Sequence, residues 1–329
     1  METYQAVVAR ERNGKITPAI ETLRMDFLPP HEVLIRVEFA ALNYKDALSA
    51  HGHTGITRQF PHTPGVDAAG TVVRDASGQF SAGDRVLCTS FDLGMNTPGG
   101  FAEFISVPAS WVIPIPSTLS TKMAMVYGTA AYTAALALHK MEMCGQNPSM
   151  GPVMITGATG GVGSMAIGLL HHAGYEVHAS SGKPSAAEYL KSLGATHIVG
   201  REEVDDNSQR PLLKSKWAGA IDNIGGNVLT TLLKACGRNG SVASIGLVKS
   251  PEFTSTVYPF ILNGVNLLGV DSAETPLPLR HLLWEKLADQ WRFTIPDEAH
   301  KVVDLDQIPD FMAKMLHGET SGRILARVS

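Results

Sequence analysis

The sequence lacks the features that mark membrane, nucleic-acid-binding and disulfide-stabilised proteins. Its cysteines, Cys88, Cys144 and Cys236, are few, odd in number and far apart, so we expect reduced, buried thiols in a cytoplasmic protein. The longest apolar segment, residues 123–138, is too short and too interrupted to cross a bilayer. With 18% charged residues and a net charge of −4, the chain offers no broad basic surface for nucleic acid.

What the chain does contain is typical of a globular enzyme with two domains. It has 329 residues, 44% of them apolar, which is enough to bury a sizeable core. Over the first 115 residues we expect short strands separated by turn residues, at 4–9, 33–40, 68–73, 85–89 and 101–107. This pattern predicts a partly open β-barrel or sandwich.

From about residue 121 the pattern changes to apolar strands that alternate with helices. We expect strands near 153–156, 176–180, 196–199, 218–222, 241–245 and 266–270, and helices near 162–173, 185–193 and 227–236. Such alternation predicts a doubly wound parallel sheet. A helix at 312–316 and a strand at 324–328 then return to the first domain. We therefore expect an α/β protein with one domain formed by residues 1–120 and 295–329 and a second formed by residues 121–294.

A glycine-rich turn joins the strand near 153–156 to the helix that follows it. Its glycines are spaced as Gly-x-x-Gly-x-x-Gly over residues 157–163, a variant of the dinucleotide-binding pattern. A turn between a buried strand and a helix offers backbone N–H groups and a helix N-terminus to a pyrophosphate. We therefore expect a dinucleotide to contact Gly160, Gly161, Val162 and Gly163.

The end of the next strand indicates which dinucleotide is bound. An NAD site usually has an acidic residue there, whereas this chain has Ser-Ser-Gly-Lys at residues 180–183, and Arg201 follows the next strand. Hydroxyls and cations would attract a 2′-phosphate, and two charge-assisted hydrogen bonds would favour NADPH over NADH by about a hundredfold. The alternative is a solvated loop over residues 180–184 that caps the helix at Ser185. We expect NADPH, bound by Ser181, Gly182, Lys183 and Arg201.

These motifs occur together with Gly-Val-Asp-Ala-Ala-Gly-Thr-Val at residues 65–72. The combination resembles the zinc-free quinone-oxidoreductase branch of the medium-chain dehydrogenase/reductase superfamily. Further segments narrow the resemblance to the NADPH-dependent acryloyl-CoA reductases, at residues 42–48, 188–195, 217–222, 269–272 and 322–323. The resemblance covers essentially the whole chain. It implies a GroES-like substrate domain, a Rossmann domain and commonly a homodimer, which we expect to pair through the edge strand at 265–270.

Zinc alcohol dehydrogenases share this architecture, so the residues themselves must indicate whether a metal is bound. The usual Gly-His-Glu segment corresponds here to Gly-Val-Asp at residues 65–67, and residues 42–46 supply no cysteine. Zinc prefers thiolate and imidazole ligands in a tetrahedral array. The nearby histidines, His51, His53 and His62, have no cysteine partner, and we expect them to be loop residues. We expect no metal.

Without a Lewis acid, the reduction of an activated C=C bond is the chemistry that this scaffold favours. The resemblance implies that hydride passes from NADPH to acryloyl-CoA and gives propanoyl-CoA. Tyr44 directly follows a predicted strand, and a phenol keeps its proton at pH 7. Related enoyl-thioester reductases use a tyrosine near this place as the proton donor. The equal alternative is that Tyr44 packs beside the nicotinamide or binds the cofactor by a hydrogen bond.

The resemblance also places Leu247, Ser272 and Arg323 beside the cofactor, the alternative for Arg323 being a surface arginine at the start of a strand. We expect Asp222 to organise a loop rather than to move a proton. Two other functions stay open at this point. One is a reductase of free quinones or alkenals without preference for CoA esters, and the other is a non-catalytic NADPH-binding module.

Overall fold

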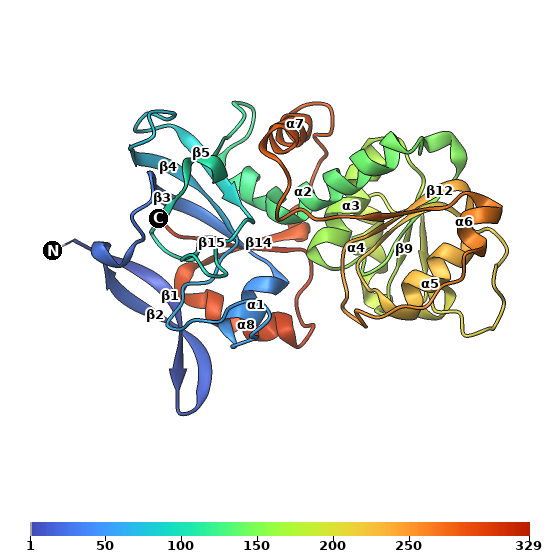
Figure 1. Ribbon diagram of the computed structural model, residues 1–329, viewed down its shortest axis with the longest axis horizontal. Helices are drawn as coiled ribbons and strands as arrows, with labels where there is room; N and C mark the ends of the chain where they lie inside the picture. The colour runs from blue at the N-terminus through green and yellow to red at the C-terminus, as the bar shows by residue number, and fades with distance from the viewer. Residues whose placement is uncertain (1) are drawn as a thin grey trace. The chain divides into compact units, whose positions relative to one another are not determined.

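The chain folds into two units, each shown in Figure 1, in a computed structural model that describes residues 2–329, leaving aside the side chain of Pro184. Unit 1 contains the residues up to Thr129 together with Ala273–Ala288 and His300–Ser329, and unit 2 contains Ala130–Ser272 and Asp289–Ala299. The α/β class with a β-rich unit and a parallel-sheet unit is as predicted. The boundaries differ chiefly at residues 273–288, which the sequence analysis places in the second domain and the structure places in unit 1.

Unit 1 is built mainly from antiparallel strands. Its larger sheet has seven strands in the order β14-β15-β3-β4-β5-β7, with β6 also paired to β3. The bounds are β3 Val33–Leu42, β4 Asp67–Asp75, β5 Arg85–Thr89, β6 Phe104–Val107, β7 Ile113–Pro114, β14 His300–Asp304 and β15 Arg323–Arg327. Along the first half of β3, Val33, Ile35 and Val37 are buried while the residues between them are not, as expected for a sheet with one covered face.

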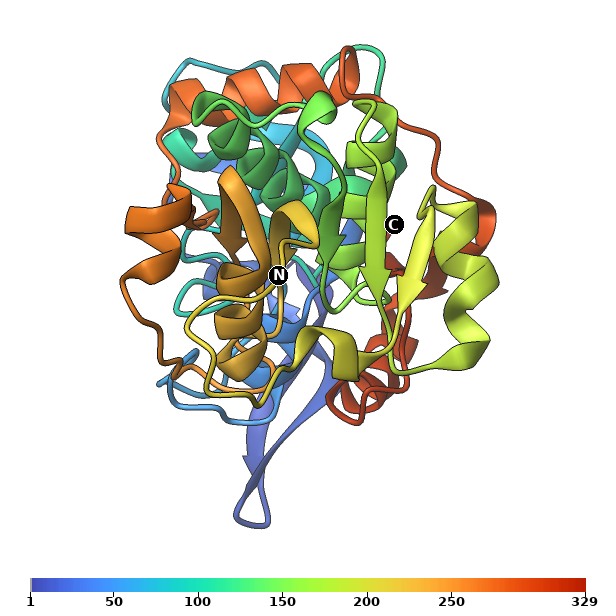
Figure 2. The ribbon, with the colours of Figure 1, turned by 90° about the vertical axis from the view of Figure 1, so that its right-hand side faces the viewer.

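Two further strands of unit 1, β1 (Thr3–Arg12) and β2 (Lys15–Arg24), form a separate antiparallel ribbon. Asn13 and Gly14 join them with φ angles of 53° and 75°, the left-handed pair that a tight hairpin turn requires. This turn projects from unit 1 in Figures 1 and 2. The sequence analysis missed β2, which contains Pro18. A proline is tolerated here because the outer side of a two-stranded ribbon needs no N–H donor.

Unit 1 contains the helices α1 (Tyr44–Ala50), α7 (Leu277–Ala288) and α8 (Ile308–Leu316), together with the first part of α2 (Thr121–Met143). Gly128 interrupts α2 with φ 48° and ψ −156°, so that a new helical segment begins at Thr129. Of these helices, the sequence analysis predicted the last part of α8 and missed α1 and α7.

Unit 2 is a six-stranded parallel sheet in the order β10-β9-β8-β11-β12-β13. Its strands are β8 Val153–Ile155, β9 Val177–Ser180, β10 His197–Val199, β11 Trp217–Asp222, β12 Cys236–Ser244 and β13 Asn266–Gly269. The helices are α3 Gly161–His172, α4 Ala187–Ser192, α5 Gly226–Ala235 and α6 Tyr258–Asn263. Figure 1 shows α3 and α5 on opposite sides of the sheet. In this strand order the chain proceeds from β8 toward one edge of the sheet and from β11 toward the other edge, so its direction of winding reverses between these two strands. Sheets of this kind bind ligands at that position.

All six predicted strands of this sheet are present, five of them within one residue of the expected bounds. The exception is β12, which begins at Cys236 rather than near 241. The central strands β8 and β11 are buried along their whole length, as parallel strands covered on both faces must be.

The cysteine prediction holds for two of the three residues. Cys88 and Cys236 are free and buried, and burial raises the pKa of each thiol to about 12, so both stay protonated. The prediction is wrong for Cys144, which lies exposed after the end of α2. Within the described residues, no helix combines the length and the apolar character that crossing a membrane requires.

Candidate active site

The glycine turn of unit 2 joins β8 to α3, with Gly160 as the residue before the first helical turn. Gly157 has φ +60°, which a side chain rarely adopts. A Cβ atom on Gly163 would collide with the Gly157 carbonyl oxygen, so only glycine allows α3 to pack this closely against the turn. The predicted turn between strand and helix is present, and the contact of its glycines with a pyrophosphate stays a prediction.

Asp222 fixes this turn from the neighbouring strand. Its carboxylate has no exposed surface and accepts hydrogen bonds from the Thr156 hydroxyl at 2.6 Å and from the Gly225 N–H at 2.9 Å. The side chain of Asn223 in turn donates to the Thr156 carbonyl oxygen at 2.8 Å. Burial raises the pKa of Asp222, while the hydrogen bonds from Thr156 and Gly225 oppose the rise. Its contacts are those of a loop organiser, as expected.

The other cofactor-binding residues predicted in unit 2 all follow the carboxyl ends of its strands. Residues 181–183 follow β9, Arg201 follows β10, Leu247 follows β12 and Ser272 follows β13. Because the carboxyl ends of parallel strands meet at one edge of a sheet, the topology brings these segments to the edge that carries the glycine turn. Leu247 is exposed, and the Ser272 hydroxyl accepts a hydrogen bond from Thr133 at 2.9 Å.

The loop after β9 and the start of the 3₁₀ turn Arg201–Val204 lie side by side. A Cβ atom on Gly182 would collide with Nε of Arg201, so the arginine side chain packs directly over the glycine backbone. In the part of the chain that the structure describes, no carboxylate pairs with the Arg201 guanidinium. The Ser181 hydroxyl accepts a hydrogen bond from the Lys183 N–H at 3.1 Å. Lys183 in this loop and Arg201 beside it therefore place two cations at the edge of the predicted dinucleotide site. Their contact with a 2′-phosphate stays a prediction.

Tyr44 is the first residue of α1 in unit 1, directly after β3 and Asn43. Its side chain is 48% exposed. Within the described chain its phenol has no hydrogen-bond partner. An exposed, unpartnered phenol at a helix start is available to a substrate or to a cofactor, so both interpretations of Tyr44 remain.

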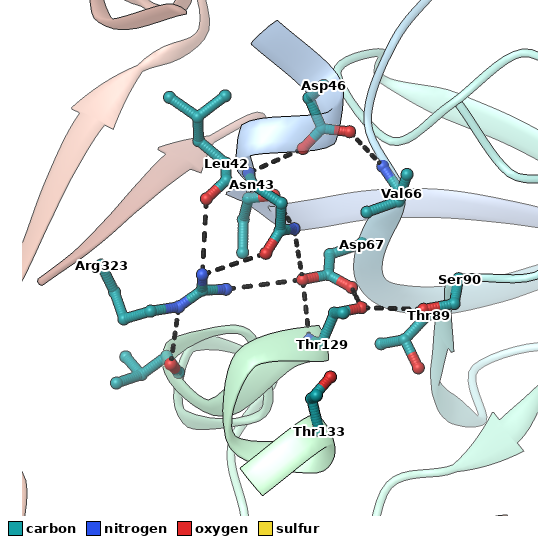
Figure 3. A network of polar contacts seen from close by, with 12 residues as sticks. Leu42, Asn43, Asp46, Val66, Asp67, Thr89, Ser90, Thr129, Thr133 and Arg323 are labelled. Carbon is teal, nitrogen blue, oxygen red and sulfur yellow. Dashed lines mark hydrogen bonds and ion pairs between the residues drawn. The ribbon is translucent and has the colours of Figure 1, made fainter. Parts of the chain in front are cut away.

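Asn43, the residue before Tyr44, belongs to a buried polar network around Asp67 that the sequence analysis did not foresee (Figure 3). At its centre is Asp67, the first residue of β4, which has no exposed surface. Its Oδ2 accepts hydrogen bonds from the Asn43 side chain and from the Thr129 N–H, each at 2.9 Å, and its Oδ1 accepts one from the Thr129 hydroxyl at 2.5 Å. The guanidinium of Arg323 completes the set at 3.4 Å from Oδ2.

Arg323, at the start of β15, is only 2% exposed, so the alternative of a surface arginine is wrong. Besides Asp67, its guanidinium donates to the Asn43 amide oxygen at 3.1 Å and to the carbonyl oxygens of Leu42 and Val126 at 3.4 and 3.2 Å. Burial lowers the pKa of Arg323, and the charge of Asp67 opposes that shift. The predicted contact with a cofactor is untested and would have to be made by a group that already has these internal partners.

A second buried carboxylate, Asp46, stands beside this network. It accepts hydrogen bonds from the Asn43 N–H at 2.7 Å and from the Val66 N–H at 2.8 Å. Burial raises the pKa of Asp46 to about 7, the charge of Asp67 adds to the rise, and the two N–H donors oppose it. Through these two hydrogen bonds Asp46 joins the start of α1 to the chain just before β4.

These donors do not fit a zinc ion. At the expected ligand position, Val66 contributes only a backbone N–H, and the carboxylates of Asp46 and Asp67 are already engaged by N–H groups and a guanidinium. His62 lies outside the helices and strands, as expected of a loop residue, and it is buried, with its carbonyl oxygen accepting a hydrogen bond from the Ala9 N–H.

Within residues 2–329, the one cluster of three potential metal ligands is Glu176, His178 and His197 in unit 2. There His178 already contacts Glu176 at 3.0 Å and accepts a hydrogen bond from the Trp217 indole N–H at 3.3 Å. Both ring nitrogens of His178 are therefore occupied.

The pKa of Asp46 leads to a test of this geometry. Between about pH 4 and pH 7 the folded chain keeps a proton on Asp46 that the unfolded chain has lost, so the free energy of unfolding should fall as pH rises. Asparagine does not titrate. We predict that the free energy of unfolding of Asp46→Asn, measured relative to that of the wild type, rises by roughly 2–4 kcal/mol as the pH is raised from 4 to 8. Urea denaturation at several pH values measures this difference, and a difference that is independent of pH would contradict the assignment.

Two family models match the chain. The GroES-like domain of alcohol dehydrogenases matches residues 29–117, and the zinc-binding dehydrogenase family matches residues 161–286. Acrylyl-CoA reductase AcuI of Ruegeria pomeroyi is 40% identical over 319 residues, which is 97% of each chain. YhfP of Bacillus subtilis, which carries the name of a quinone oxidoreductase, is 41% identical over 329 residues, which is 99% of each chain.

Solved structures agree with this similarity. YhdH of E. coli K-12 with bound NADPH has a TM-score of 0.94 to this chain at 40% identity and covers 99% of this chain and 100% of its own. YhfP of Bacillus subtilis with NAD bound has a TM-score of 0.95 at 41% identity with the same coverage. The expected family and fold are confirmed. The chain belongs to the medium-chain dehydrogenase/reductase superfamily, in the branch of the acrylyl-CoA reductases and related quinone oxidoreductases.

Proposed function

We propose that this protein is an NADPH-dependent, zinc-independent reductase of acryloyl-CoA. The observation that carries the proposal is full-length similarity to an acrylyl-CoA reductase in a chain that presents an unpartnered phenol, Tyr44, at the start of α1. The glycine turn and the edge formed by residues 181–183 and Arg201 fit the NADPH on which such a reaction depends. We also propose that the protein acts in the cytoplasm, which the free thiols of Cys88 and Cys236 support.

The reaction adds one hydride and one proton across the C=C bond. When bound, NADPH supplies the hydride for the β-carbon of the thioester. The π electrons of the C=C bond then move toward the carbonyl group and leave an enolate, and Tyr44 gives its phenolic proton to the α-carbon. Tyr44 recovers a proton from water, since its side chain is exposed in unit 1. The balance is acryloyl-CoA, NADPH and one proton converted to propanoyl-CoA and NADP⁺.

The substrate and the acid can be tested together. We predict that kcat/KM for acryloyl-CoA with NADPH far exceeds the values for free acrylate and for a benzoquinone, since only the thioester carries a CoA moiety. Tyr44→Phe should lower kcat about a hundredfold, the usual range for loss of a general acid, and leave the Kd for NADPH unchanged. Full turnover in this variant would remove Tyr44 from the acid role. A benzoquinone as the preferred substrate would favour the quinone reductase, and no NADPH oxidation at all would favour a binding module.

In this proposal the preference for NADPH over NADH depends on Lys183 and Arg201. The preference needs a test of its own, because the relative YhfP was crystallised with NAD. We predict that Arg201→Ala weakens NADPH binding about tenfold or more and leaves NADH binding unchanged, because a charge-assisted hydrogen bond to the 2′-phosphate is lost. Fluorescence titration with both dinucleotides measures this ratio. Arg210→Ala, at an exposed arginine of the same unit, is the matched control. Equal weakening of both dinucleotides would place Arg201 outside the 2′-phosphate site.

We also propose that two copies of the chain associate through unit 2. Strand β13 is an edge of the six-stranded sheet, and the side chains of Val257, Tyr258, Ile261 and Leu262 beside it in sequence are 44–68% exposed. An edge strand flanked by exposed apolar side chains is a surface that proteins normally cover.

Light scattering after chromatography tests this association. The wild type should have a mass of about 70 kDa, twice the 35.1 kDa of one chain. Ile261→Glu should yield monomers, because association would bury the glutamate carboxylate away from water without a partner. Met143→Glu, at a residue that is 74% exposed at the end of α2, is the control and should leave the mass unchanged. A wild type with the mass of a single chain would reject the dimer.

A further inference from the structure

We propose that Asp67 is a positioning residue for Tyr44, acting through Asn43 and the first turn of α1. The inference rests on the proposed function, since it assigns to Asp67 an effect on the acid of that reaction. Asp67 itself is buried in unit 1 and presents no surface to a substrate.

The side chain of Asn43 is held at both ends. Its amide nitrogen donates to the Asp67 carboxylate at 2.9 Å, and its amide oxygen accepts from the Arg323 guanidinium at 3.1 Å. A carboxylate only accepts and a guanidinium only donates, so these two partners allow one orientation of the amide. Asn43 is the residue before Tyr44, with φ −120° and ψ 159°, and it begins the helix that Tyr44 opens.

A second link fixes the backbone at the same place. The Asn43 N–H donates to Asp46, and the other oxygen of Asp46 accepts from the Val66 N–H. The start of α1 is therefore joined twice to the start of β4, once by Asp46 and Val66 and once by Asn43 and Asp67 (Figure 3). Since the Tyr44 phenol has no hydrogen-bond partner in the described chain, these links to the backbone of the first turn set its position.

The surroundings of Asp67 hold its carboxylate in place. A Cβ atom on Gly128 would lie 2.5 Å from Asp67 Oδ2 and 2.7 Å from Arg323 Nη2, so only glycine leaves room for the pair. Directly after the break in α2 at Gly128, the Thr129 N–H donates to Asp67. The carboxylate thus has three donors besides Asn43, two from Thr129 and one from Arg323, and cannot move without losing them.

The test reads the position of Tyr44 and the reaction separately. The protein is labelled with 3-fluorotyrosine, and the ¹⁹F resonance of Tyr44 is the one that disappears in Tyr44→Phe. We expect Asp67→Asn to shift or broaden this resonance and to lower kcat for acryloyl-CoA about tenfold, with the Kd for NADPH unchanged. In a Tyr44→Phe background the same substitution should lower kcat by less than about twofold, because its effect passes through the phenol.

Controls keep the test independent of folding. Asp75→Asn, at the other end of β4, removes a carboxylate that accepts hydrogen bonds from its own loop at Ser77, Gln79 and Phe80, and should leave both the resonance and kcat unchanged. Asn43→Ala breaks the link and leaves the Asp67–Arg323 ion pair intact, so it should reproduce the effects of Asp67→Asn even if that variant does not fold.

An unchanged Tyr44 resonance in the folded Asp67→Asn and Asn43→Ala variants would overturn the positioning role. An equal loss of kcat on Asp67→Asn in the wild-type and Tyr44→Phe backgrounds would do the same. By contrast, a wild type that does not reduce acryloyl-CoA would overturn the proposed function, and the shift of the resonance in Asp67→Asn would still support the positioning of Tyr44.

Discussion

The interaction on which unit 1 depends is the buried pairing of Asp67 with Arg323. The two side chains are 0% and 2% exposed, and removing one partner of such a pair leaves an uncompensated charge that typically costs about 3–5 kcal/mol. Several local features follow from accommodating this pair. Gly128 must lack a side chain, α2 must break before Thr129, and the amide of Asn43 must take one orientation. The start of α1 is therefore fixed by charges that lie out of contact with solvent.

Val66, the residue that corresponds to a zinc ligand of the alcohol dehydrogenases, directly precedes Asp67 in the sequence. Where a zinc site requires imidazole and thiolate groups, unit 1 has the apolar Val66 and two carboxylates that are already bound to N–H groups and to a guanidinium. In our proposal these polar groups serve the fold instead of a metal. The chemistry then depends on a bound dinucleotide, an exposed phenol and a substrate whose thioester already activates the C=C bond.

The sequence was most informative about unit 2. Its strands are short, apolar and regularly spaced, and residues that follow the carboxyl ends of parallel strands must meet at one edge, so the placement of Arg201 near residues 181–183 could be predicted. The polar contacts of unit 1 could not be predicted from the sequence. Asp67 and Arg323 are 256 residues apart, and no periodicity links a strand start to a distant arginine. The exposure of Cys144 and the strand around Pro18 likewise depend on neighbours that local patterns do not specify.

We propose that the network around Asp67 stands in place of a metal and that Tyr44 is the acid of the reaction. The most direct measurement is turnover of acryloyl-CoA by protein treated with a strong chelator, with the zinc content of the same sample determined by mass spectrometry. We predict undiminished kcat in protein without bound zinc, because both oxygens of Asp67 are already bonded within the described residues. Activity that falls in proportion to the zinc removed, and returns when zinc is added back, would contradict it.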